Sequence, residues 1–191
     1  MSPANRKPSA ARDRIVETAE RLFYAEGIRA VGIDRIIAEA DVAKMTLYNH
    51  FASKDDLVLA VLEYREEQVN QMFQRRLDEL TAKGLDPLEA FFAALKQWLE
   101  SPGFRGCSFI NAAVELADPQ HQAAQFAASH KQRFQKMIAS LLKQGGYAKA
   151  TSLAPAISLL VEGAIVTAVM QQSSKPASVA RKAALALVGQ S

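Results

Sequence analysis

Polar and basic side chains crowd one short stretch near the N-terminus, between residues 44 and 50. Ammonium, hydroxyl, amide and imidazole groups of this kind can bond phosphate oxygens or the edges of nucleic-acid bases. To act together, such groups need a rigid support that presents them on one face. The members of the set are Lys44, Thr46, Tyr48, Asn49 and His50.

Two short helices joined by a tight turn are predicted to provide that support. Apolar residues from Ile33 to Ala40 follow helical spacing. The turn falls at Asp41, a residue type that tolerates turn conformations, and a second helix covers residues 44–51. This arrangement is typical of a helix-turn-helix, whose second helix enters the major groove of DNA.

The motif resembles the TetR family of bacterial transcriptional regulators, whose pattern runs roughly S-K-G-T-L-Y-x-H-F-x-S-K-x-x-L. The segment that matches it is AKMTLYNHFASKDDL, and the upstream segment ETAERLFYAEG fits the family's A-x-x-L-F-x-x-x-G. The resemblance is carried by about the first 60 residues. The matching positions are Ala19, Leu22, Phe23, Gly27, Lys44, Thr46, Leu47, Tyr48, His50, Phe51, Ser53, Lys54 and Leu57.

The resemblance implies that Lys44, Met45 and Thr46 face the bases. A lysine can bond O6 and N7 of guanine, and the Met45 side chain or the Thr46 methyl group can contact the methyl group of thymine. Leu47 and Phe51 lie four positions apart and are expected to pack inward.

The same resemblance implies that Tyr48, His50 and Lys54 hold backbone phosphates, while Asn49 can serve either purpose. Each residue also has an ordinary interpretation. Tyr48 could be a core residue that exposes only its hydroxyl group, His50 a surface histidine and Lys54 a solvated charge. The DNA-binding prediction therefore depends on the ordered set and not on one residue.

The chain departs from the family pattern at several positions in this motif. Val31-Gly32 replaces the usual Thr-Ser or Thr-Thr before the first helix of the motif, so a capping hydroxyl is absent. Asp41 stands in place of the turn glycine, and Ala43 in place of the cap serine. Met45 replaces the common glycine of the recognition helix and changes the surface that faces the groove.

The rest of the chain predicts further helices, which gives an all-α protein of about nine helices. Ser53 and Asp56 form a capping-box pattern for a long helix, and Asp86-Pro87 is a strong helix start. Another start is expected at Asp118-Pro119. We predict a basic arm and three-helix DNA-binding domain over residues 1–54, and a ligand-binding and dimerisation domain over residues 55–191.

The predicted DNA-binding domain, residues 1–54, is called the head, and the predicted domain of residues 55–191 is called the body. The resemblance implies two tasks for the body. Helices near residues 151–172 and 175–188 are rich in small and aliphatic residues and are expected to pair with a second copy, forming a homodimer. An apolar pocket with a few polar groups would hold a small-molecule effector; Glu115 and Glu162 either line it or pair across helices. The pocket candidates are Phe92, Leu95, Trp98, Phe109, Asn111, Glu115, Phe126, His130, Phe134, Glu162 and Met170.

Cys107 is the single cysteine of the chain. It follows Gly106 at a predicted helix start, where amide dipoles favour a thiolate, so an electrophile-sensing role is one alternative. The other is an inert buried thiol, which is the usual state of a lone cysteine. One cysteine excludes an intramolecular disulfide and a cysteine-rich zinc site.

Composition and missing motifs set the remaining expectations. The net charge of the 191 residues is +3, which by itself says little about nucleic acid. No nucleophile elbow, phosphate loop or metal-ligand spacing is present, so no enzyme, metal or cofactor is expected. The apolar run from Leu153 to Met170 is interrupted by Glu162 and other polar residues, so it is not expected to span a membrane. No signal peptide is expected either.

We therefore predict a cytoplasmic homodimeric repressor that binds a palindromic double-stranded DNA operator and is released by an unknown small-molecule effector. An activator would use the same head. A helical partner-binding protein without DNA affinity is the rival from another class.

Overall fold

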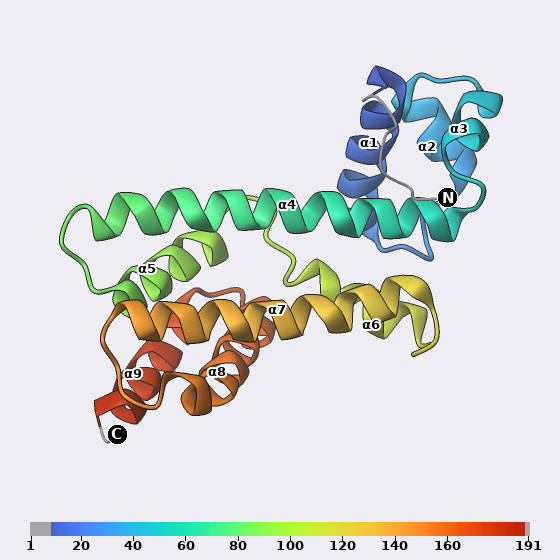
Figure 1. Ribbon diagram of the computed structural model, residues 1–191. Helices are drawn as coiled ribbons and strands as arrows, with labels where there is room; N and C mark the ends of the chain where they lie inside the picture. Colours follow the sequence, from blue (N-terminus) through green and yellow to red (C-terminus); the bar gives the residue numbers. More distant parts are fainter. Residues whose placement is uncertain (1–8, 190–191) are drawn as a thin grey trace, which may run out of the picture. The chain divides into compact units, whose positions relative to one another are not determined.

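The computed structural model describes residues 9–189, and over that range it contains nine α-helices and no strand. The prediction of an all-α chain is confirmed (Figure 1). The expected basic arm falls largely on residues 1–8, outside the described residues. The helices are α1 (Ala10–Glu26), α2 (Ile33–Ala40), α3 (Lys44–His50), α4 (Lys54–Thr81), α5 (Pro87–Leu99), α6 (Ser108–Leu116), α7 (Gln122–Gln144), α8 (Ala150–Gln171) and α9 (Lys175–Gly189).

The chain divides into two compact units that are not continuous in sequence. The first contains Met1–Glu67 and Ser108–Ala127, and the second contains Gln68–Cys107 and Ala128–Ser191. By its contacts, α6 therefore groups with α1–α3 although it follows α5 in the chain. The predicted division by function after residue 54 stays a prediction.

The first unit is built around a small apolar core shared by α1, α2 and α3 (Figure 1). Ile15, Ala19 and Leu22 lie on one face of α1 and are fully or almost fully buried. Ile36 from α2 and Leu47 from α3 complete this core, each with no exposed surface. The expected inward packing of α3 is confirmed, because the three helices bury their apolar faces against one another.

The ends of the head helices follow their local sequence. Gly32 and Ala43 precede α2 and α3, and neither offers a side-chain cap, as the sequence indicated. Ser53 begins α4 with a capping box: its hydroxyl accepts a hydrogen bond from the Asp56 amide at 3.1 Å and donates one to the Asp56 carboxylate at 2.9 Å. Asp41 ends α2 in the left-handed conformation, with φ of 51°.

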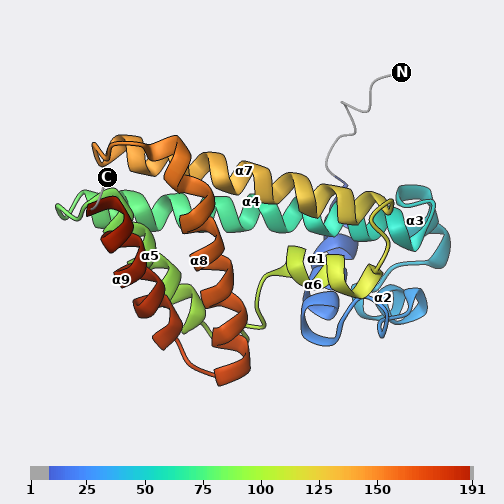
Figure 2. The ribbon, with the colours of Figure 1, turned by 90° about the horizontal axis from the view of Figure 1, so that it is seen from below.

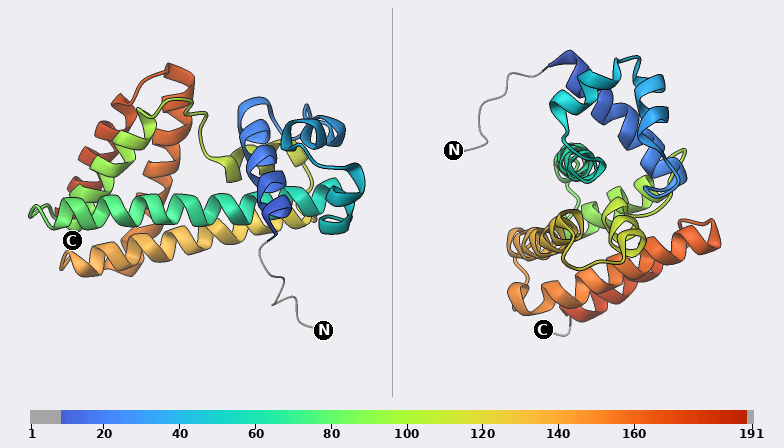
Figure 3. Two further views of the ribbon diagram at one scale, coloured as in Figure 1. Left: turned by 90° about the horizontal axis from the view of Figure 1, so that it is seen from above. Right: turned by 90° about the vertical axis from the view of Figure 1, so that its right-hand side faces the viewer.

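The second unit has its core between α5, α8 and α9. Figures 2 and 3 show α8 and α9 as an antiparallel hairpin, and α5 packs against α9. Asp86 caps α5 as predicted, because its carboxylate accepts hydrogen bonds from the amides of Leu88 at 2.8 Å and Glu89 at 3.2 Å. The Glu89 carboxylate in turn accepts both hydrogen bonds of the Arg181 guanidinium, which ties α5 to α9.

The predicted helix start at Asp118-Pro119 is wrong, since α7 begins at Gln122. The Asp118 carboxylate instead closes a local turn by accepting a hydrogen bond from the Gln120 amide at 2.9 Å. His121 caps the helix in its place: Nδ1 accepts a hydrogen bond from the Ala123 amide at 3.1 Å. A histidine cap has no common sequence signature, which is why the local pattern misplaced the start.

Candidate nucleic-acid interface

The recognition surface consists of the outer face of α3. The Lys44 side chain is 64% exposed, and Met45 and Tyr48 are 70% and 42% exposed. Asn49 is also exposed, whereas Thr46 is half-buried. Leu47 on the opposite face is fully buried. Tyr48 is thus a surface residue and not a core residue, and α3 presents hydrogen-bonding and apolar groups together from a fixed base.

Lys44 and Asp34 form an ion pair across the two helices of the motif. The Lys44 Nζ atom lies 3.4 Å from Oδ1 of Asp34, which stands in the first turn of α2. The Asp34 side chain is 87% exposed. An exposed pair of this kind is weak in water, so Lys44 can leave it for a DNA partner.

The C-terminal end of α3 lies against the start of α1. The Nε2 atom of His50 lies 3.4 Å from the Ser9 hydroxyl. The Arg12 guanidinium stacks over the Phe51 ring at 5.4 Å from its centroid. Arg12 is a cationic candidate for DNA contact that the α3 motif does not contain, because it comes from another helix.

Lys54, for which the resemblance implied a phosphate contact, bonds the main chain of its own domain. Its ammonium group donates hydrogen bonds to the carbonyl oxygens of Ile28 at 2.6 Å and Val31 at 2.7 Å, which belong to the turn between α1 and α2. Burial lowers the pKa of Lys54 from its ordinary value. The charge is therefore engaged inside the head, where it satisfies two main-chain acceptors.

The same turn is held from its other side by α6. The Glu115 carboxylate accepts a hydrogen bond from the Arg29 amide at 3.2 Å, and the Arg29 guanidinium donates one to the Leu116 carbonyl oxygen at 3.2 Å. Gly27 begins the turn with φ of +96°, and a Cβ atom there would lie 3.0 Å from the Glu115 carboxylate. Close contact with α6 and the positive φ both favour glycine at this position.

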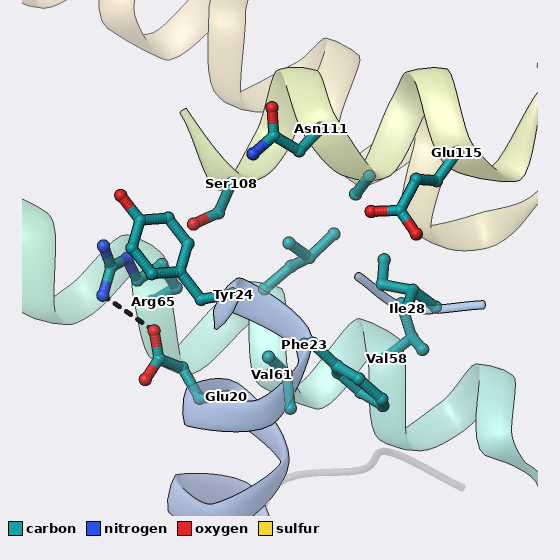
Figure 4. A pocket seen from close by; sticks show the side chains of 12 residues that line it. Glu20, Phe23, Tyr24, Ile28, Val58, Val61, Arg65, Ser108, Asn111 and Glu115 are labelled. Carbon is teal, nitrogen blue, oxygen red and sulfur yellow. Dashed lines mark hydrogen bonds and ion pairs between the residues drawn. The ribbon is translucent and has the colours of Figure 1, made fainter. Parts of the chain in front are cut away.

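A small cavity separates α6 from α1 and α4 within the first unit (Figure 4). Its volume is about 30 Å³, enough for about one water molecule. The ion pair between Glu20 and Arg65, at 2.7 Å, lies at one side, and Asn111 and Glu115 lie on the α6 side. Two of the expected effector-pocket residues thus line a cavity beside the head.

The other expected pocket residues are distributed over both units. Phe109 and Phe126 contact each other in the first unit, with ring centroids 6.4 Å apart. In the second unit, Phe92, Leu95 and His130 are buried. Met170 is 80% exposed on the outer face of α8.

An aromatic cluster in the second unit surrounds the buried Phe91 with rings that are half-buried. The Phe91 ring lies 6.1 Å from Phe134 and 5.7 Å from Phe73. Phe73 in turn lies 6.0 Å from Trp98, which meets Phe104 edge to face at 5.1 Å. These contacts bring Trp98 and Phe134, two of the predicted residues, to one apolar region.

Beside this cluster, Glu162 pairs with Lys131 at 3.4 Å. Of the two roles predicted for Glu162, the structure has the ion pair across helices, because Lys131 lies on α7 and Glu162 on α8. Lys131 Nζ also donates a hydrogen bond to Sγ of Cys107 at 3.4 Å, and Cys107 is buried. Among the described residues, no group of three or more His, Cys, Asp or Glu could hold a metal ion.

Two family descriptions match this chain and together cover both units. Residues 15–61 match the family described as bacterial regulatory proteins of the tetR family. Residues 85–183 match the C-terminal domain described as that of LmrA/YxaF-like transcriptional regulators.

Individual relatives agree with these matches. A crystal structure of a TetR-family transcriptional regulator from Streptomyces coelicolor is 35% identical, covers 93% of this chain and 95% of its own, and has a TM-score of 0.80. The HTH-type transcriptional regulator YxaF of Bacillus subtilis is 25% identical over 87% of this chain and 88% of its own length. The HTH-type transcriptional repressor KstR2 of Mycolicibacterium smegmatis is 26% identical over 73% of this chain and 66% of its own length. With α2 and α3 as its helix-turn-helix, the chain belongs to the TetR family of bacterial transcriptional regulators.

Proposed function

We propose that this regulator is a cytoplasmic repressor that binds a palindromic operator as a homodimer and leaves it when a small molecule binds the body. The observation that carries the proposal is the contrast on α3 between exposed Lys44, Met45 and Tyr48 and the fully buried Leu47. Repression is favoured over activation because a relative that aligns with most of this chain is named a repressor.

Base contacts are assigned to the N-terminal end of α3. Lys44 would bond guanine, and Met45 with Thr46 would contact a thymine methyl group. Tyr48 and His50 on α3 would hold phosphates, together with Arg12 of α1, whose guanidinium lies over the Phe51 ring just after α3. Asn49 would contact a phosphate or a base edge.

A homodimer is proposed through α8 and α9. A groove of about 420 Å³ lies between these two helices, and its lining includes Leu159, which is 69% exposed, and Val179, which is 67% exposed. Contiguous apolar surface of this kind marks an interaction site. We assign a second copy of the chain to it because a palindromic operator requires two heads, placed about 34 Å apart in successive major grooves.

The apolar character of α8 fits this interface. By length and composition α8 is the one helix of the described residues that could cross a membrane, and 39% of its most apolar window is buried inside the protein. Ser158 is buried, however, and Glu162 is ion-paired. A helix with these polar residues, packed along α9, is suited to a protein interface and not to lipid.

Release by an effector follows if the effector binds the DNA-free state more tightly than the DNA-bound state. The half-buried rings of Trp98, Phe104 and Phe134 offer apolar surface. The Lys131–Glu162 pair offers charge beside Phe134. We propose that an apolar molecule with one polar group binds there. Glu115 and Arg29 would pass a movement of α6 to the turn between α1 and α2.

The proposal is tested by selection from a randomised duplex library with the purified protein. Enrichment of a palindromic sequence, bound as a dimer in native mass spectrometry, is expected. Retained small molecules would appear in the same spectrum as extra mass on the dimer. Failure to enrich any duplex would overturn the proposal and favour a helical partner-binding protein.

Thiol sensing through Cys107 is a second candidate, supported by the hydrogen bond from Lys131 to its sulfur. Burial of the sulfur opposes it, because an electrophile must reach the atom; this is why an effector is preferred. Treatment with N-ethylmaleimide distinguishes the two: loss of DNA binding in the parent but not in Cys107→Ser would establish the sensor.

A further inference from the structure

An acidic side chain stands at the surface that is proposed to face DNA. The Asp34 carboxylate lies in the first turn of α2, is 87% exposed and pairs with Lys44 at 3.4 Å. Lys44 is the first residue of α3, so Asp34 shares the N-terminal end of the recognition surface. A carboxylate at this place requires an explanation, because DNA is a polyanion.

The chemistry of DNA allows a carboxylate very few partners. Phosphate oxygens repel it, and guanine offers only acceptors in the major groove. Two base amines donate in the major groove, N6 of adenine and N4 of cytosine, and the pairing typical of Asp and Glu is with N4 of cytosine. A G·C base pair therefore suits a paired ammonium and carboxylate, since Lys44 can bond guanine while Asp34 accepts from cytosine.

We infer that Asp34 is a specificity-determining residue that acts through Lys44. Its carboxylate makes contact of Lys44 with a G·C base pair more favourable than contact with backbone phosphates. This inference rests on the proposed DNA-binding function. Away from a G·C pair, a phosphate contact of Lys44 gives up the weak pair and leaves the Asp34 carboxylate beside phosphates that repel it. At a G·C pair, the ammonium group bonds guanine and the carboxylate accepts from cytosine. Breaking the Lys44–Asp34 ion pair is therefore compensated for both groups at such a base pair.

Glu39 and Arg35, also on α2, do not serve this purpose. Arg35 is paired with Glu26 and Glu39, and Glu39 is also bonded by Arg21 at 2.6 Å. These charges form their own network between α1 and α2, whereas Asp34 is paired with a residue of α3. The pairing with α3 is what couples Asp34 to the recognition helix.

The test uses the duplex that the parent protein enriches from a randomised library, and a scrambled duplex of the same composition. Binding of each is measured over a range of salt concentrations for the parent, Asp34→Ala, Lys44→Ala and the double variant. Glu63→Ala is the matched control: Glu63 is an exposed carboxylate on α4 of the same unit, so net charge changes equally. Thermal melting confirms that each variant is folded.

Asp34→Ala is expected to bind the scrambled duplex roughly threefold or more tightly. Its salt dependence should steepen by about one phosphate contact. The ratio of specific to scrambled affinity should fall, and repeated selection with Asp34→Ala should lose a G·C preference at one position of each half-site. In the Lys44→Ala background the gain on the scrambled duplex should vanish, and Glu63→Ala should behave as the parent.

Three results would overturn the inference while leaving the proposed function intact. They are an unchanged specificity ratio in Asp34→Ala, an equal gain in Glu63→Ala, and an undiminished gain in the Lys44→Ala background. The last result would make Asp34 a general repulsive charge that does not act through Lys44. If the parent enriches no duplex, the proposed function itself fails.

Discussion

The Arg29 amide donates a hydrogen bond to the Glu115 carboxylate at 3.2 Å, which joins the turn after α1 to the last turn of α6. These residues lie 86 positions apart in sequence. From the other side, Lys54 donates to the carbonyl oxygens of Ile28 and Val31. One amide and two carbonyl oxygens of the turn between α1 and α2 are thus bonded by α6 and α4, which fixes the first helix of the DNA-binding motif.

Gly27→Ala should weaken this junction. A side chain at φ of +96° is strained, and the new Cβ would lie 3.0 Å from the Glu115 carboxylate. We expect the free energy of unfolding in urea to fall by about 1–3 kcal/mol. Gly32→Ala is the matched control, because φ there is −84° and nothing lies within 4 Å of the added atom. An equal loss of stability in both variants would show that neither the positive φ of Gly27 nor its contact with Glu115 disfavours a side chain at this position.

Lys54→Ala and Lys44→Ala should separate stability from recognition. Removing Lys54 leaves the carbonyl oxygens of Ile28 and Val31 without their partner, which should cost about 1–3 kcal/mol in unfolding free energy. Removing Lys44, which is 64% exposed, should change stability by less than about 0.5 kcal/mol.

DNA binding should show the opposite order in the same two variants. Below its melting temperature, Lys54→Ala should keep its sequence preference, while Lys44→Ala should lose discrimination at one base position. Urea unfolding and duplex binding at several salt concentrations provide both readouts. If Lys54→Ala were as stable as the parent and its DNA binding depended less on salt, Lys54 would be a phosphate contact, as the family motif implies.

Local signals in the sequence predicted most of the fold. The apolar period of residues 33–40 and the Asp86 cap each specify a helix without help from distant residues, and the structure has both helices where expected. The exception is the start of α7, where a turn at Asp118 and a cap from His121 replace the predicted Asp-Pro start. Asp-Pro can begin a helix or a turn, and neighbouring residues alone do not decide between them.

The candidate interface was only partly predictable for a related reason. The exposed face of α3 follows from the period of its own apolar residues. The partners of Lys54 and Glu115 depend on how α4 and α6 approach the α1–α2 turn, and the pairing of Asp34 depends on the angle between α2 and α3. Such contacts join residues that share no local pattern, so a single sequence does not reveal them.

Stability at high pH should depend on Tyr147. Burial and a hydrogen bond to Asp86 raise the pKa of Tyr147 from 10.0 to about 12. Because the folded-state pKa is the higher one, the stabilisation is fully present below pH 10 and is lost as pH rises through about 12. Tyr147→Phe should therefore show a shallower fall in unfolding free energy over this range than the parent. Identical pH profiles would show that the pKa of Tyr147 is not raised in the folded protein.

The apolar groove between α8 and α9 gives a prediction about assembly. Leu159→Glu places a charge on a side chain that is 69% exposed in the single chain and lines the groove. In a dimer that side chain would be covered, so the charge would be buried without a partner. Sedimentation equilibrium should show a dimer for the parent and a monomer for Leu159→Glu, and affinity for a palindromic duplex should fall with it.

Val114→Glu is the control for that experiment. Val114 is 73% exposed on α6, outside the groove, so the same charge there should leave the dimer intact. If Leu159→Glu remains dimeric while Val114→Glu dissociates, the interface lies on the face that carries α6. If both stay dimeric, the two heads are joined by a surface other than either of these. Only monomerisation confined to Leu159→Glu assigns the groove to a second copy of the chain, because the two variants differ in where the charge is placed and not in its size or sign.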